Sequence, residues 1–320
     1  MESEQISTGP AGLGLAAICV RNPNNGLIAA ECVHLTGGEP LEDGFAFCQR
    51  VEWIPQSAYL RTGLQLLAHG PTLDDLLTAV SQADFQADGF RVDFLSLSVQ
   101  NRLRPRRSIV ALADVIPCYP NLANPQHRFL LIERQQDLFF GEVLSECQYS
   151  FQQHAAKPYR TSTSLSSQLA RALVNLVIPQ AGSLVDPCCG TGSILLEAHL
   201  LGLQTYGADQ NRRTAWMARQ NLAHFGYDVV VDHVAIQDCQ RKADALVTDL
   251  PYGRLLKADE DAIRSILEHG VKLAPLAVYV AGRNITDWLA AVGYEQIEVF
   301  TVNKHDRVVR YVHRARANQP

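Results

Sequence analysis

The sequence predicts an α/β fold: a helix-covered parallel sheet closed by an antiparallel hairpin in the C-terminal half, with an α+β region before it. Short apolar, β-rich runs alternate with helical stretches in the C-terminal half, which is typical of a parallel sheet covered on both faces. Two β-rich runs around the polar "NKHD" end the chain, which indicates a hairpin. The N-terminal half mixes helix and strand patterns without strict alternation, as α+β regions do.

The C-terminal elements are expected in a regular order. The apolar positions of the stretch 191–202 share one face, which predicts a helix directly after a strand. The expected strands are 182–187, 204–209, 229–238, 243–249 and 276–282, the expected helices are 167–177, 191–202 and 212–226, and the hairpin strands are expected at 294–302 and 307–315. This is the outline of a Rossmann-like methyltransferase sheet with a C-terminal antiparallel hairpin, rather than of a dinucleotide dehydrogenase.

The N-terminal half predicts shorter elements. The expected order is a helix at 58–70 ended by Gly70, a helix at 72–82 capped by Thr72, a strand at 90–99, a helix at 107–118 and two strands within 128–144 around the turn "RQQD". The polar and irregular stretch 150–164 separates the two halves. We therefore expect an α+β domain at 1–150 and the parallel-sheet domain at 151–320.

The composition limits the classes of protein to consider. The chain has 320 residues, of which 47% are hydrophobic and 19% charged, an ordinary globular balance. With a net charge of -5, any nucleic-acid contact must come from local basic patches such as "RLRPRR" at 102–107. The eight cysteines form no CxxC pair, which predicts reduced thiols in a cytoplasmic protein. No signal pattern or long apolar run is present, so we expect a soluble protein without membrane contact.

A glycine-containing turn, "DPCCGTG" at 186–192, predicts a ligand site. At the carboxyl edge of a parallel sheet such a turn lets a ligand approach the backbone closely, and Gly190 and Gly192 suit that role. The turn lacks the third glycine of the dinucleotide fingerprint and no GK[ST] follows, so neither NAD nor a phosphate loop is supported. Cys188 and Cys189 leave metal or redox chemistry as an alternative, but they lack a CxxC or HxxxH partner, so no metal is expected.

Acids at the ends of successive expected strands indicate which chemical groups the ligand carries. Asp209 ends one strand, where a carboxylate can accept both hydroxyls of a ribose, and Asp238 ends the next, where it can accept from an adenine amino group. The N-terminal end of the helix near Thr191 favours a carboxylate. S-adenosylmethionine combines these groups. We therefore expect Asp186, Asp209, Asp238 and Asp249 around one cleft, the alternative being that each acid only caps the next helix.

A second motif, "DLPY" at 249–252, resembles the [DN]-P-P-[YF] signature of amino methyltransferases that act on exocyclic nitrogens of bases. The resemblance implies that Asp249 and the carbonyl of Leu250 accept the two N–H bonds of the amine, which localises its lone pair. Pro251 would fix the carbonyl direction, and Tyr252 would stack on the base. Leu250 stands where the first proline of the signature usually stands. A plain turn is the alternative, because Pro-Tyr-Gly is common turn material.

Four segments together resemble the THUMP-associated tRNA guanine-N2 methyltransferase family. They are "KPYRTSTSLSSQLARALVNL", "DPCCGTGSILLEA", "GADQNRRTAWMARQNL" and "TDLPYGR". Upstream, residues 56–77 look like the ferredoxin-like domain of that family and residues 107–133 like the end of a THUMP domain. The resemblance implies an S-adenosylmethionine-dependent RNA (guanine-N2) methyltransferase whose N-terminal region binds structured RNA, with tRNA as the expected partner.

The resemblance also implies that the hydroxyl-rich "TSTS" at 161–164 covers the methionine part of the donor. The complete expected donor site is Thr161, Ser162, Thr163, Ser164, Asp186, Cys188, Gly190, Thr191, Gly192, Asp209, Gln210, Asp238, Cys239 and Asp249. The alternative for the hydroxyls is a polar linker that caps the next helix through Ser164 or Ser166. Two other functions stay open: adenine-N6 methylation of DNA or ribosomal RNA, and RNA binding without turnover.

Overall fold

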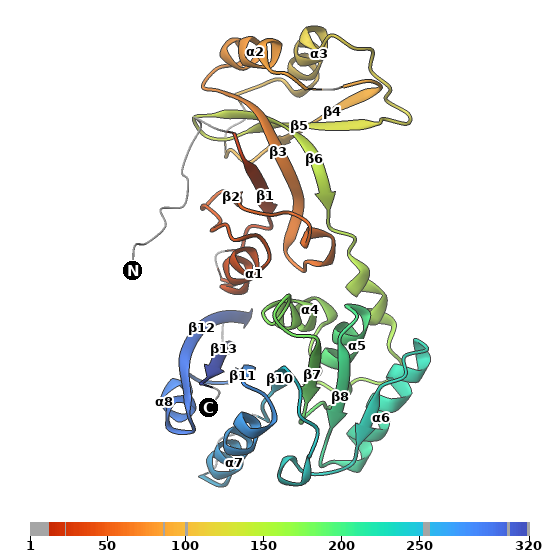
Figure 1. Ribbon diagram of the computed structural model, residues 1–320, viewed down its shortest axis with the longest axis vertical. Coiled ribbons are helices and arrows are strands. Elements are labelled where there is room, and N and C mark those ends of the chain that lie inside the picture. Colours follow the sequence, from red (N-terminus) through yellow and green to blue (C-terminus); the bar gives the residue numbers. More distant parts are fainter. Residues whose placement is uncertain are drawn as a thin grey trace. The chain divides into compact units, whose positions relative to one another are not determined.

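The computed structural model describes residues 13–22, 24–85, 87–99, 102–251, 257–305 and 308–318. These residues form two compact units (Figure 1). The first combines the described residues up to Arg21 with Leu35–Pro55 and Tyr59–Gln148, and the second combines Asn22–His34, Gln56–Ala58 and the described residues from Tyr149 onward. The second unit therefore includes two short segments from the N-terminal part of the chain.

The first unit is built on a six-stranded sheet in the order β2-β1-β3-β6-β5-β4. Strands β4 and β5 are parallel, and the other neighbours are antiparallel. Its elements are β1 (Leu15–Cys19), β2 (Phe45–Cys48), η1 (Ile54–Gln56, in this unit up to Pro55), β3 (Leu60–Gly70), α2 (Leu73–Gln82), β4 (Phe90–Ser96), α3 (Pro105–Val115), β5 (His127–Glu133) and β6 (Leu138–Glu146). The expected mixed α+β character is confirmed, and the assignment to ferredoxin-like and THUMP-like folds stays a prediction.

The prediction of a helix at 58–70 is wrong. Residues Leu60–Gly70 form β3, which lies between β1 and β6. The buried Leu64, Leu66 and Ala68 alternate with less buried neighbours, which is the two-residue period of a strand. Leucine favours helices in isolation. Hydrogen bonding along both edges of a central strand and packing of the buried face outweigh that preference here.

The second unit contains a seven-stranded sheet in the order β12-β13-β11-β10-β7-β8-β9. Its elements are α1 (Leu27–Thr36, in this unit up to His34), η2 (Ser150–Ala156), α4 (Ser167–Asn175), β7 (Ser183–Asp186), α5 (Ser193–Leu200), β8 (Gln204–Ala208), α6 (Arg212–His224), β9 (Val230–Asp232), η3 (Ile236–Asp238), β10 (Ala245–Asp249), α7 (Lys257–Leu273), β11 (Leu276–Ala281), α8 (Thr286–Ala291), β12 (Tyr294–His305) and β13 (Val308–Ala317). Strands β7 to β11 are parallel, and β13 pairs antiparallel with both β11 and β12. The predicted parallel sheet with its terminal hairpin is confirmed. Within the described ranges, no helix is long and apolar enough to cross a membrane.

Two helices begin with side-chain caps, the predicted one at Thr72 and, at Ser166, one of the two alternatives that the sequence left open. The Oγ1 atom of Thr72 accepts from the backbone N of Asp75 at 3.2 Å, at the start of α2. The Oγ atom of Ser166 accepts from the backbone N of Leu169 at 3.3 Å, at the start of α4. Of the two hydroxyls considered as caps of α4, Ser166 therefore has this role, which leaves Ser164 available for other contacts.

A buried polar network joins η2, α4 and α5. Both Arg171 and Glu197 are fully buried, and Nε of Arg171 donates to Oε2 of Glu197 at 2.9 Å. A second nitrogen of Arg171, Nη1, donates to the carbonyl of Gln56 at 3.0 Å. The other carboxylate oxygen of Glu197 lies 2.6 Å from Nδ1 of His154, and Nε2 of that ring lies 3.0 Å from the hydroxyl of Tyr227. Because these charges are buried and paired, they restrict how the three elements can pack.

Helix α1 extends this network to the N-terminal segments of the second unit. The Oε1 atom of Glu31 accepts from the backbone N of Ala58 at 2.7 Å and from Nδ2 of Asn175 at 2.6 Å. Just before the helix, Asn25 pairs with Val302 of β12. The segments 22–34 and 56–58 are therefore held by α4 and by the hairpin.

Candidate active site

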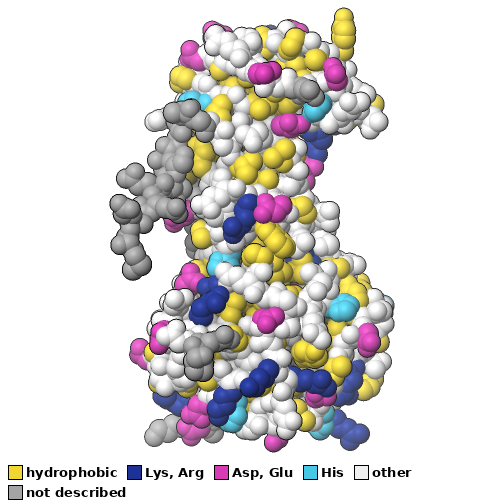
Figure 2. All heavy atoms as spheres, in the orientation of Figure 1, with side chains coloured by type: hydrophobic (Ala, Val, Ile, Leu, Met, Phe, Trp, Pro, Cys, Tyr) yellow, Lys and Arg dark blue, Asp and Glu magenta, His cyan; other side chains and the backbone are white. Residues whose placement is uncertain are grey.

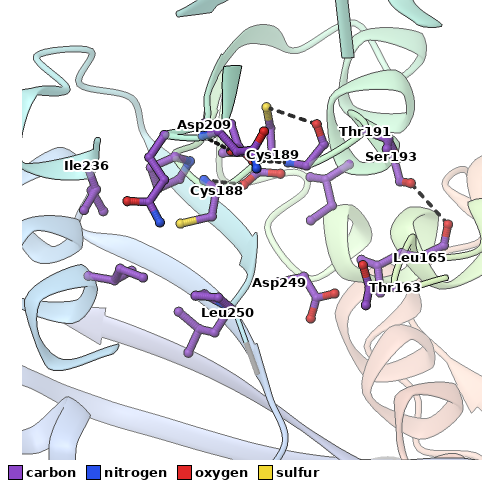
Figure 3. Close-up of a pocket in the computed structure, with 18 of the residues that line it drawn as sticks. Thr163, Leu165, Cys188, Cys189, Thr191, Ser193, Asp209, Ile236, Asp249 and Leu250 are labelled. Atoms are coloured by element: carbon purple, nitrogen blue, oxygen red, sulfur yellow. Dashed lines mark hydrogen bonds between the residues drawn. The ribbon is translucent and has the colours of Figure 1, made fainter. Parts of the chain in front are cut away.

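A cavity lies at the middle of the second sheet, where the direction of strand progression reverses. From β7 the chain proceeds to β8 and β9 on one side, and it then returns to β10 on the other side of β7. The loops that leave the carboxyl ends of β7 and β10 diverge at such a point and form a ligand-binding crevice. The cavity has a volume of about 500 Å³ (Figure 3). Its walls come from Thr161, Thr163, Ser164, Leu165, Asp186, Pro187, Cys188, Cys189, Gly190, Thr191, Ser193, Ile194, Asp209, Gln210, Asn211, Ile236, Gln237, Asp249, Leu250, Pro251, Ala262, Ser265 and Ile266.

The turn between β7 and α5 forms one wall of the cavity. Gly190 and Gly192 have φ values of 52° and 79°, in the left-handed region that glycine adopts without steric cost. A Cβ atom on Gly192 would lie 3.3 Å from Cβ of Ala218, so glycine also allows α6 to pack close to the turn. The backbone N of Gly190 donates to Oδ2 of Asp209 at 2.8 Å. This bond ties the turn to the end of β8.

Asp209 holds two loops together and is not the cap of α6. Its Oδ1 atom accepts from the backbone N of Asn211 at 2.8 Å and from Oγ1 of Thr214 at 2.9 Å. The N-cap of α6 is Asn211, which accepts from the backbone N of Arg213 and of Thr214. The alternative that Asp209 serves only as a helix cap is therefore wrong.

Asp186 is a buried acid at the end of β7, only 1% exposed. Its Oδ1 atom accepts from Oγ1 of Thr248 at 2.6 Å and from the backbone N of Cys188 at 3.2 Å. Burial raises the pKa of this carboxyl to about 8, and the negative charges of Asp209 and Asp249 act in the same direction. The cavity therefore contains an acid whose neutral form is favoured by burial.

This raised pKa predicts a pH-dependent stability. A carboxyl whose pKa rises from 3.8 to about 8 on folding stabilises the fold fully below pH 4, and this contribution is lost as the pH rises through about 8. Asp186→Asn cannot ionise, so its free energy of unfolding should fall less between about pH 5 and about pH 9 than that of the wild type. Urea unfolding at the two pH values measures the difference. Asp244→Asn is the control, because hydrogen bonds from Ser183 lower the pKa of Asp244. Equal falls in the wild type and Asp186→Asn would contradict the prediction.

The two adjacent cysteines are buried thiols. Burial is the main cause that raises the pKa of both Cys188 and Cys189, and the nearby Asp186 and Asp209 add to the effect. A thiol with a raised pKa is a poor nucleophile and a poor metal ligand. In the described part of the chain, no group of three or more His, Cys, Asp or Glu side chains could hold a metal ion.

The segment before α4 closes another side of the cavity through its hydroxyls. Oγ of Ser164 lies 2.9 Å from Oγ1 of Thr191. Behind them, Nζ of Lys157 donates to Thr191 at 3.4 Å and, at shorter range, to Ser193. Lys157 is buried, and burial together with the positive charge of Arg160 lowers its pKa to about 8. A buried ammonium therefore lies behind the N-terminal end of α5.

The "DLP" residues bring the end of β10 to the same cavity. Asp249 is half-buried, and Figure 3 shows its carboxylate between Leu250 and Thr163. The backbone N of Leu250 donates to the carbonyl of Val280 at 2.9 Å. The side chain of Leu250 is buried in the apolar cluster that includes Ile266. An aliphatic residue at position 250 therefore has a structural role that a proline could not fill, because proline lacks the donated N–H.

Most of the predicted site residues line this cavity. Those brought together are Thr161, Thr163, Ser164, Asp186, Cys188, Gly190, Thr191, Asp209, Gln210, Asp249, Leu250 and Pro251. Ser162, Gly192, Asp238 and Cys239 are not among the lining residues, and Tyr252 lies outside the described residues.

The prediction that a strand ends at Asp238 is wrong. The strand β9 ends at Asp232, and Asp238 ends the short helix η3 with an exposed side chain. Its neighbours Ile236 and Gln237 line the cavity instead. The expected ring of four acids therefore contains three, and an apolar side chain stands beside them.

Several cavity residues carry no signal in the sequence. Ala262, Ser265 and Ile266 come from α7 and line the cavity with one face of that helix. Lys157 does not line the cavity and lies in the quoted segment "KPYRTSTS", but its contacts with Thr191 and Ser193 are seen only in the structure. Asn211 and Ser193, in contrast, lie inside quoted motifs, each two residues after a predicted site residue, Asp209 and Thr191.

Comparisons with known proteins agree with this geometry. Residues 155–269 match a family described as "RMKL-like, methyltransferase domain". The tRNA (guanine(10)-N2)-dimethyltransferase of Methanothermobacter thermautotrophicus is 37% identical over 130 residues, which cover 39% of this chain and 37% of the relative. The human U6 snRNA (guanine-N(2))-methyltransferase THUMPD2 is 31% identical over 122 residues, which cover 36% of this chain and 24% of the relative. The chain thus spans less than half the length of these relatives.

A solved structure resembles nearly the whole chain. The crystal structure of TrmN from Thermus thermophilus superimposes with a TM-score of 0.51 at 18% sequence identity, and the match covers 94% of this chain and 99% of that one. At this identity the comparison shows a shared fold.

Proposed function

We propose that the chain, whose residues 155–269 match the RMKL-like methyltransferase domain, is an S-adenosylmethionine-dependent RNA methyltransferase. It methylates the exocyclic N2 of guanosine in tRNA. The observation that carries the proposal is the convergence on one cavity of the glycine turn, Asp209 and Asp249. The relatives named for guanine-N2 methylation of tRNA and U6 snRNA support the choice of base and of RNA.

The residues of the cavity fit the methyl donor. A volume of about 500 Å³ lies within the usual range for sites of this kind, roughly 300–1,000 Å³. Asp209 and the apolar Ile236 suit the ribose and the adenine ring. The N-terminal end of α5, with Lys157 behind it, suits the methionine carboxylate. When bound, the donor supplies an electrophilic methyl group.

The end of β10 suits the acceptor base. The Asp249 carboxylate and the Leu250 carbonyl would accept the two N–H bonds of the amine, which holds its lone pair toward the donor. Tyr252, outside the described residues, would provide a stacking face. The base must leave its stack to reach this point, as in other enzymes that modify bases.

The product identifies the substrate. The protein is incubated with methyl-labelled donor and unmodified bulk tRNA, and the nucleosides are separated after digestion. We expect the label in N2-methylated guanosine. Label in N6-methyladenosine would replace this proposal by adenine methylation. No transfer, with donor and RNA binding intact, would leave an RNA-binding protein without turnover.

The first unit is proposed to bind structured RNA. Arg104, Arg106 and Arg107 are exposed at the start of α3, where they can contact phosphates. We assign the protein to the cytoplasm on the basis of its cysteine pattern, which lacks CxxC pairs.

Lys157→Met is expected to weaken binding of the methyl donor by about tenfold. The substitution removes the positive charge behind α5 and the hydrogen bonds that the ammonium group donates to Thr191 and Ser193. Affinity for 5′-methylthioadenosine, which lacks the amino acid, should stay unchanged. Because the pKa of Lys157 is about 8, wild-type affinity for the complete donor should fall as the pH rises from about 7 to about 9. Titration calorimetry measures both ligands. Equal losses for both would contradict the assigned role.

A further inference from the structure

We propose that the surface formed by Tyr159, Arg160, Arg212, Arg213 and Trp216 binds the RNA strand that flanks the target nucleotide, with a base stacked on Trp216. We call it the Trp216 surface. The inference rests on the proposed function and adds to it a second contact point for the substrate, outside the cavity.

Trp216 is exposed where most large apolar side chains are buried. It is 44% exposed, although it lies on α6, whose inner face packs in the core through Ala215, Ala218 and Leu222. Its ring centroid is 4.9 Å from that of Tyr159 at an interplanar angle of 68°. This edge contact orients the indole and leaves ring surface open to solvent.

The partner of Trp216 is held rigidly. Asn221 accepts from the backbone N of Tyr159 and donates to its carbonyl, each at 2.9 Å. The same side chain donates to the carbonyl of Thr191, a cavity residue, at 2.8 Å. The aromatic pair is therefore fixed to the wall of the active site, as a stacking platform requires.

Both segments that form the Trp216 surface, 159–160 and 212–216, are adjacent in sequence to residues that line the cavity. Arg160 precedes Thr161, and Arg212 follows Asn211, and both Thr161 and Asn211 line the cavity. Positions 212, 213 and 216 share one face of α6, because residues three and four apart are neighbours on a helix. A strand that places one nucleotide in the cavity can therefore reach this face with the next.

The charge of the Trp216 surface favours a polyanion. Arg160, Arg212 and Arg213 are exposed, and none forms an ion pair with a residue in the described part of the chain. Figure 2 shows Lys and Arg side chains gathered in the lower part of the view, where Figure 1 draws α6 and α7. The whole chain has a net charge of -5, so this cluster is local. Arginines beside an exposed aromatic ring match the phosphates and bases of a single strand.

Fluorescence tests the stacking directly. The chain has three tryptophans, so Trp53→Phe with Trp288→Phe leaves only Trp216 as reporter. Titration of this variant with unmodified tRNA should quench its emission, because a stacked base quenches indole. Unchanged emission at RNA concentrations that saturate binding would overturn the inference.

Variants separate this surface from the catalytic site. Trp216→Ala should weaken tRNA binding by roughly 5- to 100-fold and Trp216→Phe by much less, with donor affinity unchanged in both. The double variant Arg160→Gln/Arg213→Gln should lose about two phosphate contacts. The slope of log affinity against log salt concentration should therefore decrease in magnitude by about two. The control is Lys242→Gln, an exposed cation that precedes the amino end of the central strand β10.

The outcomes distinguish the two proposals. If all of these variants keep the RNA affinity and the salt dependence of the wild type, the proposal that the Trp216 surface binds RNA is overturned. A surface that binds a protein partner instead would give that result. If the variants lose RNA affinity while the wild type transfers no methyl group to RNA, the surface stands and the proposed methyl transfer fails.

Discussion

Asp249→Ala is expected to slow methyl transfer to RNA by at least about 10²- to 10³-fold, the usual loss when a group that stabilises the transition state is removed. The carboxylate lies at the end of β10 in the wall of the cavity. An exocyclic amine is a poor nucleophile because its lone pair is delocalised into the ring, and only an acceptor at this point holds the pair toward the methyl group. Because the interaction of this acceptor with the amine strengthens in the transition state, donor and RNA affinities should fall much less than the transfer rate.

Single-turnover transfer with labelled donor measures this loss, and calorimetry measures the two affinities. Asp238→Ala is the matched control, because it removes the same side chain from an exposed position of the same unit that does not line the cavity. It should transfer at the wild-type rate. A transfer rate of Asp249→Ala within tenfold of the wild-type rate would exclude Asp249 as the hydrogen-bond acceptor for the amine.

Arg171→Met is expected to lower the free energy of unfolding of the second unit by about 3–5 kcal/mol, because it leaves the buried carboxylate of Glu197 without its cationic partner. Both side chains are fully buried, so water cannot replace the lost bonds. The variant also removes the donor to the carbonyl of Gln56. At roughly 2–4 °C per kcal/mol, the melting temperature should fall by on the order of 10 °C.

Thermal unfolding followed by tryptophan emission in a Trp53→Phe background reports on the second unit, which contains Trp216 and Trp288. The control is Arg241→Met, which breaks an ion pair with Asp232 whose side chains are 46% and 41% exposed. Such exposed pairs contribute less than about 1 kcal/mol. Equal shifts in the two variants would contradict the role assigned to the buried pair.

The sequence predicts the sheet of the second unit well, because local pattern and tertiary structure agree there. Strands β7, β8, β10 and β11 are short runs, and each ends at or next to an acid, a glycine or a proline. The ends of three of these strands carry Asp186, Asp209 and Asp249, and a parallel sheet brings such ends to one edge. The chemistry of the site therefore follows from the order of the strands.

The predictions failed where long-range packing decides the structure. The leucine-rich 60–70 forms a strand because β1 and β6 pair with both of its edges, which no local pattern reveals. The run 229–238 alternates enough to suggest one strand, but only Val230–Asp232 pairs with β8. The face that α7 presents to the cavity depends on how that helix packs, so its three lining residues could not be identified beforehand.

The two N-terminal segments of the second unit affect how the protein can be made and divided. Residues 22–34 and 56–58 leave the ribosome well before the strands and α4 that hold them. Their final contacts therefore form only after most of the chain has been synthesised. A fragment that begins at Tyr149 would lack Glu31 and Gln56, the partners of Asn175 and Arg171. Transfer of the C-terminal half alone to another protein would therefore leave Asn175 and Arg171 without these partners.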